Sequence, residues 1–74
     1  MNEIIYGILK EIRPEFDFTD SNDYIEDGFL DSFDLTTLVA ELEEKFDCLI
    51  DPMDIRAENF ATVDTISALV EKSK

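Results

Sequence analysis

The 74-residue sequence contains no histidine and no tryptophan, one cysteine, two glycines and two prolines. Cys48 therefore has no partner for an internal disulfide, and we expect it to be a small, partly buried apolar side chain. Without histidine the chain has no Cys–His pair, no Ser–His–Asp triad and no zinc cluster of the usual ligands. Most forms of nucleophilic and metal catalysis are excluded, and we expect the protein not to be an enzyme.

Basic residues are also scarce, with six lysines and arginines against 19 aspartates and glutamates and a net charge of −13 at pH 7. Residues 15 to 58 carry 15 of the acids and two of the bases, so the net charge is confined to the middle of the chain. Such a surface repels phosphates, which argues against nucleic acids and anionic lipids and in favour of basic protein partners. Crowded carboxylates are also expected to raise one another's pKa.

Long apolar runs are missing, and the chain begins without the basic and apolar segments of a secretory signal. We therefore expect a cytoplasmic protein with no membrane insertion. Because 45% of the residues are hydrophobic and no linker or repeat divides them, residues 1 to 74 should fold as one domain, which we expect to be a monomer.

Apolar periodicity and capping residues predict an all-α four-helix bundle. Three longer helices are expected at about residues 2 to 13, 32 to 46 and 63 to 72, and a short one at about 52 to 57. Residues 15 to 30 show no period and are expected to form a long ordered loop between the first two helices. The residues expected in the core are Ile4, Ile5, Ile8, Leu9, Ile12, Leu35, Leu38, Val39, Leu42, Phe46, Leu49, Ile50, Met53, Ile55, Val63, Ile66, Leu69 and Val70.

Ser32 is the strongest candidate for a functional residue. It lies in the first turn of the expected helix at 32 to 46, directly after the capping residue Asp31. Backbone N–H groups and the positive end of the helix dipole would stabilise a phosphate esterified to its hydroxyl. Position alone leaves a second interpretation open, in which Asp31 and Ser32 are only a capping pair.

Phe33 lies about 160° from the core-facing arc of this helix, on the same side as Thr37, Ala40 and Glu44. An aromatic residue there either folds back under the preceding loop or serves as an anchor for a docking partner. The acids around it are either part of a partner-binding face or a solvated helix surface. These acids are Asp34, Glu41, Glu43, Glu44 and Asp47.

The segment GFLDSFD at residues 28 to 34, followed by LVAELE at 38 to 43, resembles the attachment segment of acyl carrier and peptidyl carrier proteins. Two later segments, IDPMDI at 50 to 55 and ENFATVDTI at 58 to 66, resemble the third-helix and fourth-helix segments of stand-alone carriers. The likeness covers almost the whole chain.

The resemblance implies that a separate phosphopantetheinyl transferase attaches 4′-phosphopantetheine from coenzyme A to Ser32, with Asp31 shaping the attachment site. It further implies a carrier that holds an acyl or aminoacyl group as a thioester. An adenylating ligase would load this carrier, and a downstream acyl or aminoacyl transferase would unload it. The residues that match the family's partner-facing positions are Phe33, Asp34, Thr37, Ala40, Glu41 and Glu44.

One departure from the commonest pattern bears on the cargo. Fatty-acid-synthesis carriers usually have glycine three residues before the serine and leucine after it, whereas here Gly28 is four before and Phe33 follows. The G-x-L-D-S form is similar to D-alanyl carrier proteins of teichoic-acid D-alanylation and to specialised biosynthetic carriers. We therefore expect an aminoacyl or specialised acyl cargo.

Two alternatives lack a prosthetic group. Asp23, Asp27, Gly28 and Asp31 fit positions 1, 5, 6 and 9 of a calcium-binding EF-hand loop, although position 3 is Ile25 and the required preceding helix is missing. The chain could instead be an acidic protein-interaction module that occupies a basic partner. A binding isotherm for calcium tests the first alternative. Replacement of Ser32 by alanine tests the second, because such a module would keep its activity.

Overall fold

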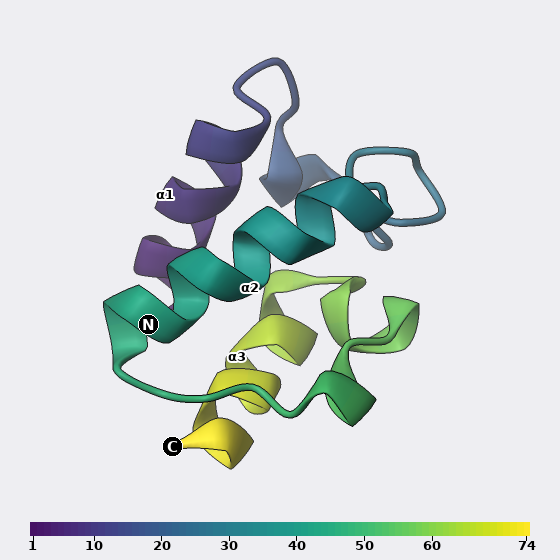
Figure 1. The fold of residues 1–74 in the computed structure, drawn as a ribbon. Helices are drawn as coiled ribbons and strands as arrows, with labels where there is room; N and C mark the ends of the chain where they lie inside the picture. The colour runs from purple at the N-terminus through teal and green to yellow at the C-terminus, as the bar shows by residue number, and fades with distance from the viewer.

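Three α-helices and two long loops form the structure, a computed structural model that describes residues 1–74 (Figure 1). The helices are α1 (Asn2–Ile12), α2 (Ser32–Phe46) and α3 (Val63–Ser73), and α1 packs against both others. In Figure 1, α2 crosses the front of the molecule, between α1 above and α3 below. The expected all-helical bundle is confirmed. None of the helices has the length and apolar character that a membrane-spanning helix requires.

The expected short helix takes the form of two 3-10 turns, η2 (Pro52–Asp54) and η3 (Ala57–Phe60). Asp51 caps η2 by accepting the N–H of Met53, and Ile55 then leaves helical geometry with φ −81° and ψ 80°. η2 therefore ends after a single turn. A further turn that the pattern did not predict, η1 (Phe18–Asp20), lies in the loop between α1 and α2.

The starts of α2 and α3 agree with the capping residues in the sequence. The carboxylate of Asp31 accepts the N–H of Asp34, and Thr62 accepts the N–H of Thr65 in the same way. Both helices thus satisfy backbone donors that have no acceptor inside the helix. α2 ends where Asp47 adopts the left-handed conformation with φ 52°.

One core of 16 buried residues joins the three helices and the loops. These residues are Ile5, Ile8, Leu9, Phe18, Tyr24, Leu30, Leu38, Val39, Leu42, Cys48, Ile50, Phe60, Val63, Ile66, Leu69 and Val70. Burial raises the pKa of the Cys48 thiol, which disfavours the reactive thiolate.

The loop before α2 is held by a residue to which the sequence assigned no role. Tyr24 is buried, donates its N–H to the carbonyl of Ala61 at 2.7 Å, and accepts the N–H of Phe29 at 2.8 Å. Its ring packs edge-on to Phe18, with ring centroids 4.9 Å apart. Burial is the main reason that the pKa of Tyr24 rises to about 12. This packing fixes the chain shortly before it enters α2.

Four residues expected in the core are exposed instead. Leu49 is 82% exposed because it lies beyond the end of α2, where the turn at Asp47 breaks the helical period. Met53 and Ile55 are exposed because η2 makes only one turn. Ile4 is 49% exposed because it lies at the edge of the apolar arc of α1.

Candidate functional site

Ser32 is the first residue of α2, and its side chain is exposed. The hydrogen bonds at this helix start run between Asp31 and Asp34, and none involves the Ser32 hydroxyl. The helix that follows has 15 residues, so its dipole places positive potential at Ser32. The structure therefore places an accessible hydroxyl without a hydrogen-bond partner at the positive end of a long helix.

Asp31 and Asp34 form a reciprocal capping box around Ser32. Asp31 Oδ1 accepts the N–H of Asp34 at 2.9 Å, and Asp34 Oδ2 accepts the N–H of Asp31 at 3.2 Å. The backbone on both sides of Ser32 is thus fixed by two carboxylates. Asp31 is the N-cap of α2, as its place in the sequence predicts.

The structure corrects the position of Asp34. We expect this residue on the exposed partner face, but its side chain is only 7% exposed and its Oδ2 lies 2.8 Å from Nε of Arg13. A buried carboxylate needs a counter-charge, and Arg13 at the end of α1 supplies it. Asp34 therefore belongs to the internal support of the helix start and not to the docking surface.

Sequence reasoning missed the role of Arg13. Its guanidinium also lies 3.5 Å from Asp31 Oδ2 and 3.6 Å from a carboxylate oxygen of Glu15. In the sequence Arg13 marks only the end of a helix before Pro14. The available signal was its isolation, because it is the last base before a long acidic segment.

Two carboxylates shift in the direction opposite to the one expected from charge crowding. The N–H of Asp34 is the main cause that lowers the pKa of Asp31, and Arg13 lowers it further. The pKa of Asp17 is lowered mainly by the hydroxyl and the N–H of Thr19. At these two positions hydrogen bonds outweigh repulsion between acids.

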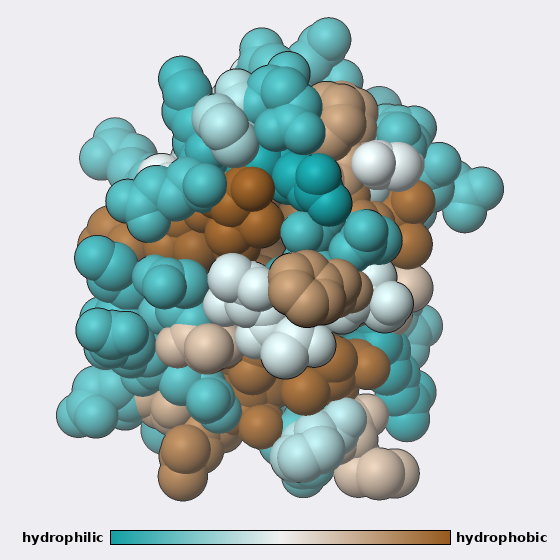
Figure 2. Space-filling model, turned by 45° about the horizontal axis from the view of Figure 1, so that its top comes forward, coloured by the Kyte–Doolittle hydropathy of each residue, from teal (hydrophilic) through white to brown (hydrophobic).

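The other residues of the expected partner face are accessible. Phe33 is 77% exposed, so it does not fold under the preceding loop. Thr37, Ala40 and Glu44 are also exposed, and Glu41 is half-buried. Figure 2 shows apolar side chains interspersed among hydrophilic ones on one side of the molecule. An exposed aromatic residue thus lies next to Ser32 on an acidic helix.

The carboxylates of the proposed calcium loop do not converge. Asp23 accepts the N–H groups of Ile25 and Glu26, and Asp27 accepts the hydroxyl of Ser21 at 2.6 Å. Nowhere in residues 1–74 do three or more acidic or cysteine side chains come together as metal ligands would. The loop acids fold the loop and do not form an EF-hand site.

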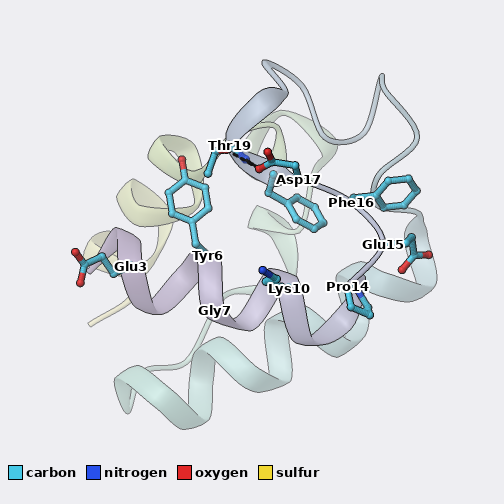
Figure 3. Close-up of a pocket in the computed structure, with 10 residues that line it drawn as sticks. Glu3, Tyr6, Gly7, Lys10, Pro14, Glu15, Phe16, Asp17 and Thr19 are labelled. Atoms are coloured by element: carbon cyan, nitrogen blue, oxygen red, sulfur yellow. Dashed lines mark hydrogen bonds between the residues drawn. The ribbon is translucent and has the colours of Figure 1, made fainter.

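A hollow of about 630 Å³ lies elsewhere, between α1 and the loop that follows it (Figure 3). Tyr6 and Lys10 line it from α1, and Phe16, Asp17 and Thr19 line it from the loop. It contains none of the residues expected to be functional. Ser32 lines no hollow of the surface, so the candidate attachment site is an exposed helix start.

Comparisons with known proteins agree with this geometry. Residues 3–71 match the family described as "Phosphopantetheine attachment site". The chain belongs to this family. The carrier is 32% identical to the D-alanyl carrier protein of Lactococcus lactis subsp. lactis strain IL1403, over 100% of this chain and 96% of the relative. It is also 32% identical to the D-alanyl carrier protein of L. lactis subsp. cremoris strain MG1363, over 97% of this chain and 94% of the relative. No solved structure gives a significant match.

Membership settles the general chemistry. Proteins of this family are non-catalytic carriers of acyl or aminoacyl groups, and they bear a covalently attached 4′-phosphopantetheine. They interact with the enzymes that modify and load them.

The residues at the start of α2 fit such a group. A phosphodiester on the Ser32 hydroxyl would face water and the N-terminal dipole of α2, and no side chain covers the position. Asp31 adds a negative charge beside it, which Arg13 offsets at 3.5 Å. The exposure and the charge at this helix start are therefore compatible with a phosphate on Ser32.

Proposed function

We propose that Ser32 is the residue that carries 4′-phosphopantetheine, and that the protein passes an acyl or aminoacyl group between enzymes on this arm. The observation that carries the proposal is the exposed Ser32 hydroxyl, free of hydrogen bonds, at the start of a 15-residue helix in a chain of this family. Asp31 supports the attachment by fixing the backbone at Ser32.

Attachment requires one substitution at phosphorus. The Ser32 hydroxyl oxygen forms a new bond to the phosphorus of coenzyme A that bears the pantetheine, and the bond from that phosphorus to the leaving adenosine bisphosphate breaks. The hydroxyl proton passes to a base of the transferase, since the carboxylates of Asp31 and Asp34 bond to backbone N–H groups and not to this hydroxyl. The attached arm supplies a terminal thiol that holds the cargo as a thioester.

The exposed side of α2 is the proposed docking surface for three enzymes. These are the phosphopantetheinyl transferase, an adenylating ligase that loads the cargo, and a transferase that receives it. Phe33 would enter an apolar recess, while Glu41 and Glu44 attract lysine and arginine side chains around that recess. The net charge of −13 would accelerate these encounters at low salt.

D-Alanine is the proposed cargo. The support is the name of the two relatives, both D-alanyl carrier proteins, which this chain matches along nearly its whole length. The G-x-L-D-S segment at residues 28 to 32 agrees with that likeness.

The test of attachment uses coenzyme A, magnesium and a promiscuous phosphopantetheinyl transferase, followed by intact-mass measurement. We expect one phosphopantetheine on the wild-type chain and on Ser67→Ala, a control that removes a hydroxyl from α3. Ser32→Ala should remain folded and unmodified. A wild-type chain still unmodified after exhaustive reaction with an active transferase would contradict the proposal.

A further inference from the structure

Arg13 connects two parts of the chain that lie 18 to 21 residues apart in sequence. It follows the last residue of α1, where its N–H donates to the carbonyl of Leu9 at 2.9 Å. Its guanidinium contacts both carboxylates of the α2 capping box, Asp34 at 2.8 Å and Asp31 at 3.5 Å. One side chain thus holds the two residues whose hydrogen bonds enclose Ser32.

The contact with Asp34 determines where that carboxylate can lie. Asp34 Oδ2 accepts two hydrogen bonds, one from the Nε–H of Arg13 and one from the backbone N–H of Asp31. Because the side chain is 7% exposed, losing the guanidinium would leave a desolvated charge without a partner. The carboxylate would then turn toward water, and the N–H of Asp31 would lose its acceptor.

The side chain of Ser32 does not hold this helix start; the backbone is held there by the capping box and by the bond from the N–H of Leu35 to the carbonyl of Asp31 at 3.1 Å. The Ser32 hydroxyl has no hydrogen bond, and its side chain is exposed. The backbone before it is set by Asp31, whose φ of −115° and ψ of −177° are extended and are maintained by the two reciprocal bonds. A cap that opens would move the hydroxyl relative to a docked enzyme.

We propose that Arg13 is a positioning residue for the loading of Ser32, acting through Asp34 and the capping box. This inference rests on the proposed attachment at Ser32. Arg13 brings no reactive group to the hydroxyl. It keeps the first turn of α2 in the geometry that the transferase meets, and a misplacement of this kind slows a transfer reaction without weakening docking.

The first experiment compares Arg13→Gln with Lys10→Gln in the full chain. Lys10 lies in the last turn of α1, three residues before Arg13, is exposed and takes part in none of the salt bridges, so both variants lose one positive charge from the same end of this helix. Transfer kinetics are measured where circular dichroism shows each variant to be folded. We expect Arg13→Gln to lower kcat about tenfold with KM within about twofold, and Lys10→Gln to match the wild type.

A second readout does not involve transfer. Amide hydrogen exchange at Asp31 and Asp34 should be faster in Arg13→Gln than in the wild type, and unchanged in Lys10→Gln. Equal kcat for folded Arg13→Gln and wild type would overturn the proposal, because a role in stability alone predicts that equality. Unchanged exchange at both amides would overturn it as well.

A double variant tests the route through Asp34. In Arg13→Gln/Asp34→Asn the amide oxygen of Asn can still accept the N–H of Asp31, and no buried charge remains. We expect amide protection and kcat to return to within about twofold of the wild type. Restored protection with a persistently low kcat would overturn the route through the cap, because Arg13 would then act directly on the transferase or on coenzyme A.

If Arg13→Gln does not fold, the same transfer kinetics are measured on Arg13→Lys. It keeps a charge for Asp34 but lacks the second arm of the fork that reaches Asp31. We expect a folded protein with reduced kcat, and a wild-type rate would overturn the proposal. A wild-type chain that cannot be modified would overturn the proposed function itself, whereas equal loading of all variants would overturn only the role of Arg13.

Discussion

The starts of α2 and α3 use the same hydrogen-bond pattern with different chemistry. In α2 two carboxylates exchange bonds of 2.9 and 3.2 Å with backbone N–H groups, and in α3 two threonine hydroxyls do so at 3.2 and 3.1 Å. The α3 box is local, because Thr65 also donates its hydroxyl to the carbonyl of Thr62. The α2 box reaches across the fold to Arg13.

The comparison shows which features of the α2 cap are needed to begin a helix and which are additional. Neutral hydroxyls are sufficient to begin α3, so a charged cap is not required for folding. The carboxylates of α2 add a tertiary link and place charge beside Ser32. We therefore interpret the ionic cap as part of the carrier site.

The largest expected effect on stability comes from truncating the residue that lies three positions after each helix cap, Asp34 in α2 and Thr65 in α3. Asp34→Ala removes a buried carboxylate that is bonded to both Arg13 and Asp31, and should lower the free energy of unfolding by about 2 kcal/mol. Thr65→Ala removes a neutral, partly exposed partner and should lower it by about 1 kcal/mol. Urea unfolding of both variants measures the contrast, and equal losses would show that the ionic link adds no stability.

A smaller effect on the free energy of unfolding is expected from pH, because Asp31 caps α2 with a carboxylate whereas α3 is capped by a threonine hydroxyl. Folding lowers the pKa of Asp31 below its ordinary value of 3.8, so its contribution to stability is present above that value. The contribution is lost as the pH falls through the lower pKa of the folded state. In an NMR titration we expect the amide shift of Asp34 to change below about pH 4, while that of Thr65 stays constant. A constant Asp34 shift down to acid unfolding would contradict the expectation.

The smallest effect on stability is expected at the exposed apolar residues of α2. Phe33→Ala should change the free energy of unfolding by less than about 0.5 kcal/mol, because the side chain is 77% exposed. It should nevertheless slow loading. Met53→Ala is the matched control, since Met53 is 72% exposed in η2 and outside the proposed docking residues. If both variants load at the wild-type rate, Phe33 is not an anchor.

The helix starts and the place of Ser32 could be predicted from the sequence because they depend on local signals. Asp31 and Thr62 mark helix starts because a cap acts on N–H groups only a few residues away. Ser32 and Phe33 could be placed for the same reason. This local signal gives their place in the helix, whereas the link from the cap around Ser32 to Arg13 is tertiary.

The errors concern residues whose environment is set by distant parts of the chain. Asp34 is buried because Arg13, 21 residues earlier, neutralises it. Tyr24 is buried where its ring packs against Phe18 and its N–H bonds to the carbonyl of Ala61, far along the sequence. Leu49 fits the helical period in the sequence but lies outside the helix, because the left-handed turn at Asp47 ends α2 first. No periodicity within one segment carries this information.

The most direct test of the central claim is the mass of the protein isolated from its own host, before and after hydroxylamine treatment and with fragmentation around Ser32. We expect one phosphopantetheine on Ser32, with an additional mass of alanine that hydroxylamine removes because it is a thioester. Alanine recovered as the D enantiomer would agree with the proposed cargo. An unmodified chain, or an arm attached at any other residue, would contradict the account.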